Sequence, residues 1–517
     1  MANSNLFSSI RGALLPAAMA RNEAGGLAYA RSPQSALALF AATGCLNGVF
    51  YASDEQQLEQ VLALCAQVEP GFVARTALYA RQVAHMKDMP ALLVATLTTR
   101  DPEAFAKVFP RVIDNGRMLR NVVQILRSGR VGRKSLGSLP RRMVRQWLEQ
   151  ASVDALINAA IGNQPSLADV IRMVHPKPAD AQREALYAWV IGKAYSEEAL
   201  PAKLQAYEAF KRAPGEVLPD LPFQYYSALQ LTPSHWKTLA RNASWQTLRM
   251  NLNTFARNGV FTDAALVVEL ADRLRDPALI RRARVFPYQL LMAFHAIGAD
   301  VPGAIGEALQ DAMEVATRQV PVLDGQVVVA VDVSGSMQSP VTGYRKGSTT
   351  AVRCVDVAAL VAACVQRTNP DARVMPFDTE VRDLRLNPRD SVMTQSRHLA
   401  AMLGGGTAIS SPFARLNSER AKVDLLVLVS DNQSWVDTRG GGATETMRQW
   451  AQIKARCPQA RLVCIDLQPN ATSQSVERDD VLHVGGFSDA VFDLLAVYAA
   501  QGAGATRWVE RIASMEL

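Results

Sequence analysis

Five oxygen-bearing residues in the last third of the chain could together hold a metal ion. Asp332, Ser334 and Ser336 follow an apolar run, Thr407 follows three glycines, and Asp431 ends a second apolar run. The two carboxylates bring negative charge and the three hydroxyls bring neutral oxygens, a set of hard ligands that suits Mg²⁺ or Mn²⁺. A site with few direct carboxylates also leaves the cation able to accept an anionic oxygen from a partner. We therefore expect a divalent-cation site at these residues.

The elements around these residues predict a sheet that brings them together. From about residue 322, near-continuous apolar runs alternate with helical stretches, as in a parallel sheet covered on both faces. Ligands of such sheets bind at the carboxyl ends of the strands, where the loops of Asp332 and Asp431 fall. The runs that predict strands are 326–331, 373–377, 423–429 and 461–465, and those that predict helices are near 351–367, 391–403, 444–455 and 489–499.

The same residues allow other interpretations. Asp332, Ser334 and Ser336 alone also fit a Ser-rich turn in which Asp332 caps the next helix, and the full set also fits a degenerate site that folds without metal. A phosphoryl-accepting Asp332 would need a partner acid and a lysine at defined spacing, and the sequence shows neither. The six histidines form no ligand pair, and no Walker loop, nucleophile elbow or Rossmann fingerprint occurs. We expect no catalytic residues and no enzyme activity.

The first part of the chain predicts one helix after another. From about residue 30 to 315, apolar residues recur at three- and four-residue spacing, and proline- or glycine-containing breaks such as 214–222 separate the segments. Short helices in pairs of about 35–45 residues indicate a HEAT-like α-solenoid. No clean repeat consensus emerges, so a large irregular helical domain is the alternative. We expect helical repeats over residues 1–320 and the sheet domain over residues 321–517.

Charge and cysteine content limit the class of protein. The net charge is +7, and the excess lies in the first 320 residues, where 35 Lys and Arg face 27 Asp and Glu. This excess indicates an acidic partner for the helical part. The six cysteines include no C-x-x-C pair, which fits buried free thiols in a reducing compartment. No apolar run reaches the roughly 18 residues of a membrane helix, so we expect a cytoplasmic protein with no membrane partner, and a monomer.

One segment concentrates the positive charge. Residues 117–148 carry nine Lys and Arg and no Asp or Glu, with a Gly- and Ser-rich stretch in the middle that predicts a loop between helices. A charge run is usually a solvated face, but such a face normally mixes signs, so we expect phosphate contacts here. The candidate residues are Arg117, Arg120, Arg127, Arg130, Arg133, Lys134, Arg141, Arg142 and Arg145.

The chain as a whole resembles the Ro autoantigen family, in which a TROVE helical module precedes a von Willebrand factor A domain. The resemblance is carried by residues 133–147, 167–178 and 282–288. The five oxygen ligands follow in the order of the metal-ion-dependent adhesion site (MIDAS) of A domains. A chain of this kind without a signal peptide resembles a bacterial member.

The resemblance implies a fold, partners and further contact residues. The helical repeats of the family close into a ring, the ring binds small noncoding Y RNAs, and the ends of misfolded RNAs enter its hole. Bacterial members act with exonucleases, notably polynucleotide phosphorylase. By motif, Arg172, His175 and Lys177 correspond to an RNA-contacting segment, and Lys134, Arg141, Arg142 and Arg145 correspond to a basic helix.

These expectations together predict a non-catalytic RNA-binding protein. It would bind Y-like RNA and the single-stranded ends of misfolded or structured RNAs, and would serve an exonuclease as an adaptor in RNA quality control, maturation or decay. Two alternatives stay open. One is a protein-only adaptor of helical repeats and an A domain, which predicts no copurifying RNA. The other is a metal-dependent phosphatase or nuclease, which predicts turnover that depends on divalent cations and on Asp332.

Overall fold

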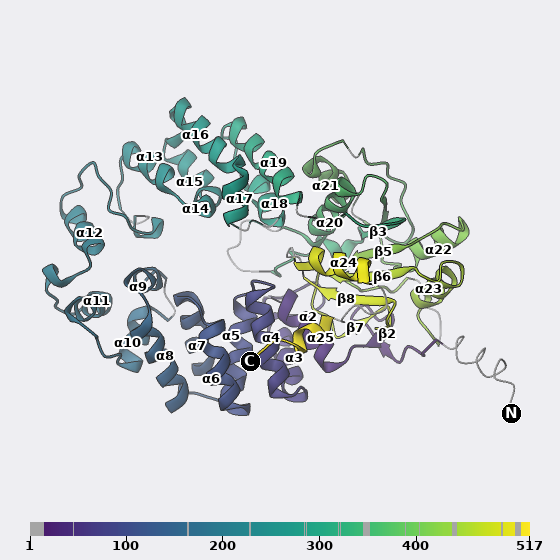
Figure 1. The fold of residues 1–517 in the computed structure, drawn as a ribbon, viewed down its shortest axis with the longest axis horizontal. Helices are drawn as coiled ribbons and strands as arrows, with labels where there is room; N and C mark the ends of the chain where they lie inside the picture. The colour runs from purple at the N-terminus through teal and green to yellow at the C-terminus, as the bar shows by residue number, and fades with distance from the viewer. Residues whose placement is uncertain are drawn as a thin grey trace. The chain divides into compact units, whose positions relative to one another are not determined.

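A computed structural model gives the fold in two compact units, which we describe separately (Figure 1). Residues 1–67 and 317–514 form one unit, called here the A-domain unit, and residues 68–316 with 515–517 form the other, the helical unit. The structure describes residues 15–517 apart from 45, 163–164, 227–228, 284, 286, 319, 321, 345–351, 388, 403, 437–441, 487–489 and 502–507.

A five-stranded parallel sheet forms the centre of the A-domain unit. Its strand order is β4-β3-β5-β6-β8. The three central strands are buried along nearly their whole length, which explains why their sequences are continuously apolar rather than alternating. Strands β3 and β5 are neighbours, and the chain leaves them toward opposite edges of the sheet, so a crevice for a ligand is expected at their carboxyl ends. The bounds are β3 Val327–Asp332, β4 Arg373–Phe377, β5 Leu425–Ser430, β6 Arg461–Asp466 and β8 Val481–Gly485.

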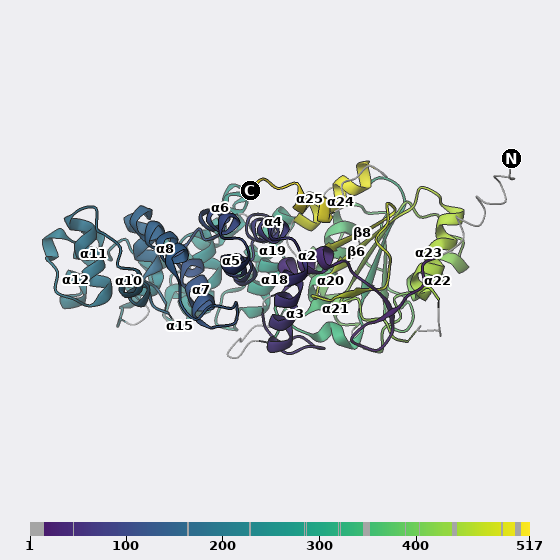
Figure 2. The ribbon, with the colours of Figure 1, turned by 90° about the horizontal axis from the view of Figure 1, so that it is seen from below.

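Helices cover both faces of this sheet. Figure 2 shows the strands between α22 and α23 on one face and α20 and α24 on the other. Phe413 of α22 and Trp450 of α23 are fully buried against alternate residues of β3 and β5, such as Ala330 and Leu428. The bounds are α20 Cys354–Thr368, α21 Val392–Ala400, α22 Ser411–Ser418, α23 Glu445–Arg456, α24 Ala490–Gln501 and α25 Trp508–Ala513.

The N-terminal segment is part of the A-domain unit. Strand β1 (Ala20–Arg21) forms a hairpin with β2 (Leu27–Ala30), and β2 pairs antiparallel with β7 (Thr472–Ser473). Helix α2 (Pro33–Thr43) packs against β8, where Leu39 approaches Gly485 so closely that a Cβ at Gly485 would lie 2.3 Å from a Leu39 methyl carbon. Helix α3 (Asp54–Gln67) packs on α2. We expected the first 67 residues to belong to the helical domain, which would end at residue 320. They belong instead to the A-domain unit, because they pack on its sheet.

The helical unit consists of short helices that lie one after another in chain order (Figure 1). Many begin with a capped turn: the Asn115 side chain accepts from the Met118 amide, and Ser166 and Asp169 form a capping box. The bounds are α4 Pro70–Gln82, α5 Asp88–Arg100, α6 Pro102–Val112, α7 Gly116–Arg127, α8 Ser138–Gln150, α9 Val153–Ala159, α10 Leu167–Val174, α11 Ala181–Ile191, α12 Ala202–Arg212, α13 Pro233–Asn242, α14 Trp245–Met250, α15 Leu252–Arg257, α16 Ala264–Arg275, α17 Pro277–Ala283, α18 Pro287–Ala296 and α19 Gly303–Thr317.

The helices agree with the apolar spacing except in a few places. The helical apolar spacing continues from residue 236 to 258, but the structure divides this stretch, because Ser244 caps a new helix and α13, α14 and α15 are separate. Helix α5 is missing from the sequence pattern because ten consecutive residues, 89–98, are buried and leave no amphipathic period. The five described cysteines are free thiols, whereas Cys45 lies outside the described residues. None of the helices in the described part of the chain has the length and hydropathy to span a bilayer.

Candidate functional site

The predicted cation ligands lie at the carboxyl ends of β3 and β5, all of them buried. Asp332 is the last residue of β3, and its Oδ1 accepts the Ser334 amide at 2.9 Å. The Ser334 and Ser336 hydroxyls lie 3.4 Å apart, and Asp431, which directly follows β5, lies close to Ser336. Exposed fractions are 0% for Asp332 and Ser334, 6% for Ser336, and 2% for Thr407 and Asp431.

Thr407 reaches the site through a glycine loop bound to both neighbours. The Gly335 amide donates to the Gly405 carbonyl at 3.1 Å, and the Trp435 amide donates to the Thr407 carbonyl at 3.1 Å. Gly405 has φ +72°, and a Cβ there would lie 2.3 Å from a carboxylate oxygen of Asp378, so the loop requires glycine. The backbone thus brings the loops of all five predicted ligands together.

The electrostatics of the site favour a bound cation. Burial raises the pKa of Asp431 to about 7, and the charge of Asp332 contributes to the shift. Burial likewise raises the pKa of Asp332, although its hydrogen bonds with Ser334 and Ser430 oppose the shift. Two buried carboxylates without a nearby positive charge are costly, and a divalent cation between them would remove that cost.

Three further residues around the site were not predicted from the sequence. The Ser430 hydroxyl donates to Asp332 Oδ2 at 2.6 Å. Asp378, buried after β4, forms an ion pair with Arg382 that, with backbone amides, lowers its pKa although burial alone would raise it. Tyr51 of the N-terminal segment lies beside Ser336, and burial, together with the charge of Asp431, raises the Tyr51 pKa to about 12. An acidic residue directly after a third apolar run was a readable signal for Asp378, but nothing in the sequence pointed to Tyr51.

The donor set fits Mg²⁺ or Mn²⁺. Two carboxylates and three hydroxyls are all oxygen ligands, and waters can complete an octahedral shell. Among the described residues, no group of three or more His, Cys, Asp or Glu forms an alternative metal centre. The ligands that would hold the cation are therefore Asp332, Ser334, Ser336, Thr407 and Asp431.

The predicted RNA-contacting residues fall into two groups in the helical unit. They lie on α7, α8 and α10, of which α10 packs on the other two, and on the loops that follow α7 and α10. The exposed group forms what we call the basic face: Arg117, Arg127, Arg130, Lys134, Arg141, Arg142, Arg172, His175 and Lys177. Acids border this face, since Asp169 lies 3.7 Å from Arg172 and the Glu149 carboxylate accepts the Lys177 amide at 2.9 Å.

The second group supports the protein backbone. Arg133 donates to the Thr98 carbonyl at 2.7 Å, Arg145 donates to the Val174 carbonyl at 2.8 Å, and half-buried Arg120 reaches the Gly116 carbonyl at 3.4 Å. These guanidinium groups hold the loop after α7, the end of α10 and the start of α7. Sequence charge alone could not separate them from the exposed group.

His175 joins two parts of the basic face and lies beside a pocket. It ends α10 in the left-handed conformation, with φ 52°, and its Nδ1 lies 3.4 Å from Arg141 Nη2. A cavity of about 630 Å³ between α10 and α11 is lined by His175, Pro176, Pro178 and the exposed ring of Tyr195, with Arg172 and Lys193 among the other residues that line it. The size and apolar walls suit a planar ring.

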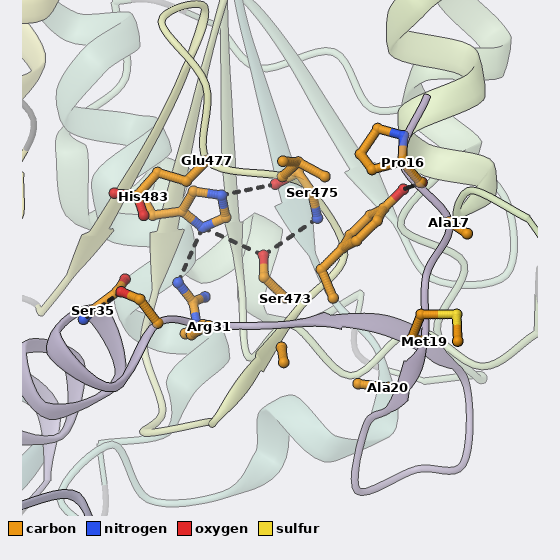
Figure 3. A pocket seen from close by; sticks show the side chains of 14 residues that line it. Pro16, Ala17, Met19, Ala20, Arg31, Ser35, Ser473, Ser475, Glu477 and His483 are labelled. Atoms are coloured by element: carbon orange, nitrogen blue, oxygen red, sulfur yellow. Dashed lines mark hydrogen bonds between the residues drawn. The ribbon is translucent and has the colours of Figure 1, made fainter. Parts of the chain in front are cut away.

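A second pocket, of about 420 Å³, lies inside the A-domain unit and contains a buried histidine (Figure 3). His483 Nε2 lies 3.2 Å from the Ser475 hydroxyl, and His483 Nδ1 lies 3.9 Å from Asp466, which suggests a hydrolytic triad. Arg31 argues against that role. It pairs with Asp466 at 2.7 Å and lies 3.1 Å from His483 Nδ1, and a guanidinium can only donate. Nε2 of the neutral ring therefore carries the proton and cannot accept one from Ser475.

Comparisons with known proteins agree with this fold. The Ro60 vWA-domain family model matches residues 326–499. A protein named RNA-binding protein RO60, from Deinococcus radiodurans, is 30% identical over 93% of this chain and 95% of its own length. The crystal structure of Deinococcus radiodurans RO (RSR) protein matches with a TM-score of 0.63 and 24% identity over 90% of this chain and 99% of that one. The predicted fold class, helical repeats with a doubly wound A domain, is confirmed, and this chain belongs to the Ro family.

Proposed function

We propose that this protein binds small noncoding, Y-like RNA and the single-stranded ends of misfolded or structured RNAs. The observation that carries the proposal is the basic face, where nine exposed cationic or imidazole side chains lie on α7, α8, α10 and the loops after α7 and α10. Arg and Lys neutralise phosphates, and RNA shape and unpaired bases supply specificity. The pocket beside His175 offers room for one unstacked base, with the Tyr195 ring in its wall. The relative named RNA-binding protein RO60 supports the same assignment.

The A domain completes the proposal as a docking module without catalysis. Its five oxygen ligands hold Mg²⁺ or Mn²⁺, and the cation supplies an electrophilic position for a carboxylate of a protein partner. The partner class is an exonuclease such as polynucleotide phosphorylase, so that the protein acts as an adaptor in RNA quality control, maturation or decay in the cytoplasm. The protonated Nε2 of His483 supports a non-catalytic role at the one triad-like cluster described above.

Replacing Lys134, Arg141 and Arg142 together with Ala is expected to weaken RNA binding and its salt dependence. If about five phosphates are contacted, log K falls with log salt at a slope of about −3 to −4, and losing three contacts flattens it by about 2 to 3. These three side chains are exposed, so the fold is spared, whereas Arg145 holds the Val174 carbonyl and is left in place. Fluorescence anisotropy with a labelled Y-like RNA at several salt concentrations measures both quantities.

A matched control removes three cations of the same unit that already pair with acids. Lys107 lies 3.0 Å from Glu103, Lys203 lies 3.0 Å from Asp220, and Lys237 lies 3.6 Å from Asp263. Their joint replacement with Ala should leave the affinity and slope near those of the wild type. Equal losses in both triple variants would show that overall charge, not the basic face, determines binding.

Protein purified from cells is expected to carry RNA that stays intact when Mg²⁺ is added. Bound RNA would exclude the protein-only adaptor, and intact RNA would exclude a metal-dependent nuclease. Sequencing of the copurified RNA, with gel analysis before and after Mg²⁺, gives both results. Degradation that disappears in Asp332→Ala would instead support the nuclease, and the absence of RNA from repeated preparations would contradict the proposed function.

A further inference from the structure

The burial of the five cation ligands is unexpected for a docking site. A carboxylate from another molecule needs an open coordination position, yet none of the five residues is more than 6% exposed. The loops that carry Asp332 and Asp431 lie at the carboxyl ends of β3 and β5. Two parts of the N-terminal segment lie against the loops that carry these ligands. Each of them is about 300 residues or more away in sequence from the loop residue that it approaches.

The first contact is Tyr51, which is placed by a close backbone approach. Its hydroxyl lies beside the Ser336 side chain and close to the Asp431 and Asp332 carboxylates. Just before it, the Gly48 carbonyl accepts the Tyr344 amide at 2.7 Å, and the Asn47 side chain donates to the Thr342 carbonyl at 2.8 Å. A Cβ at Gly343, whose φ is +73°, would lie 2.8 Å from the Gly48 carbonyl oxygen, so only glycine permits this approach.

The second contact is the turn of the N-terminal hairpin, which lies on the loop after Asp431. Gln433 in that loop is fully buried, and its side chain donates to the Glu23 carboxylate at 2.7 Å and accepts the Ala24 amide at 3.3 Å. The Asn22 side chain donates to the Ser434 carbonyl at 2.6 Å. Glu23 is also near enough to Tyr51 to act on it electrostatically, so the two contacts border the same region.

We propose that the N-terminal segment covers the cation site, with Tyr51 on the side from which a carboxylate of another molecule approaches. The inference rests on the cation site of the proposed function. In the covered arrangement the protein's own residues and waters complete the shell. A partner carboxylate reaches the cation only when Tyr51 moves away from Ser336. Tyr51 and the Glu23 turn thereby control which ligands reach the site: Tyr51 by occupying space, and Glu23 by repelling anions.

Water-proton relaxivity of Mn²⁺ bound to the full-length protein tests the cover directly, because it reports how many exchanging waters the ion holds. Wild-type protein should show low relaxivity per bound Mn²⁺, and Tyr51→Ala should raise it about twofold, as expected when a second water position opens in an octahedral shell. Sodium acetate should then lower the relaxivity of Tyr51→Ala and leave that of the wild type unchanged. Val497→Ala is the control, because Val497 is a 40% exposed apolar residue of the same unit on α24, which packs on β6 and β8.

The other outcomes separate the cover from the cation site itself. Equal relaxivity and equal acetate effects in wild type and Tyr51→Ala would overturn the cover while leaving the cation site intact. Mn²⁺ binding by calorimetry that is the same in wild type and Asp332→Ala would refute the cation site. If Tyr51→Ala does not fold, Tyr51→Leu decides, because it keeps an apolar side chain and removes the ring that occupies the space beside the site. Relaxivity above the wild-type value in Tyr51→Leu supports the cover, and unchanged relaxivity overturns it.

Discussion

Replacing Arg31 with Ala should destabilise the A-domain unit by about 3–5 kcal/mol, because it leaves the buried Asp466 carboxylate without its partner. The side chains of Arg31 and Asp466 are 4% and 3% exposed, and the ion pair is 2.7 Å long. Arg31 also donates to the Thr472 carbonyl at 3.1 Å, so the same change loosens β7 from the strand it pairs with. Hydrogen exchange should accelerate about 100-fold or more in β2, β7 and β8, at about 1.4 kcal/mol per factor of ten.

Two comparison variants show whether burial of the pair causes the effect. Lys422→Ala removes an ion pair of the same unit in which Lys422 is 74% exposed, and it should cost at most about 1 kcal/mol. Replacing both Arg31 and Asp466 with Ala should cost less than the sum of the two single changes, since no buried charge is then left unpaired. Additive costs would mean that Arg31 and Asp466 act independently, and the account of this pair would be wrong.

The residues around the cation show how much of this site the sequence could predict. Asp332 ends one apolar run and Asp431 follows another. Both runs are apolar because their strands are buried on both faces, so the local pattern predicted the strands and the loops after them. The neighbouring loops were predictable as well, since a Gly-rich stretch before Thr407 fits the positive φ of Gly405. Strand β7 was not predicted, because two residues give no period, and β8 was not predicted either, because His483 interrupts its apolar run.

Contacts between distant parts of the chain explain what the sequence could not give. Arg31 and Asp466 are 435 positions apart, and no period relates them. The apolar residues of α2 and α3 predict helices but not the surface on which these helices pack, so their membership in the A-domain unit depends on the pairing of β2 with β7 and not on their own pattern. For the same reason, a count of positive charges could not show that Arg133 and Arg145 turn toward backbone carbonyls while Arg141 and Arg142 stay exposed.

Asp332→Asn is expected to have opposite effects on stability with and without Mg²⁺. In a chelator the variant should be more stable than the wild type by about 1–3 kcal/mol, because it removes one of two buried carboxylates that repel each other. That repulsion adds to burial in raising the Asp431 pKa to about 7. With Mg²⁺ at about 100 times its Kd the wild type should gain about 2.7 kcal/mol, and the variant should gain nothing.

Urea unfolding, monitored by hydrogen exchange in β3 and β5 with and without Mg²⁺, measures both effects on the A-domain unit. Asp356→Asn is the matched control, because Asp356 is a buried carboxylate outside the site that pairs with Arg353 at 2.7 Å. It should lower stability equally in both conditions and keep the full gain from Mg²⁺. If Asp332→Asn keeps that gain too, Asp332 is not a ligand of the cation. If the variant is less stable than the wild type in chelator, hydrogen bonds from Ser334 and Ser430 outweigh carboxylate repulsion in the metal-free site.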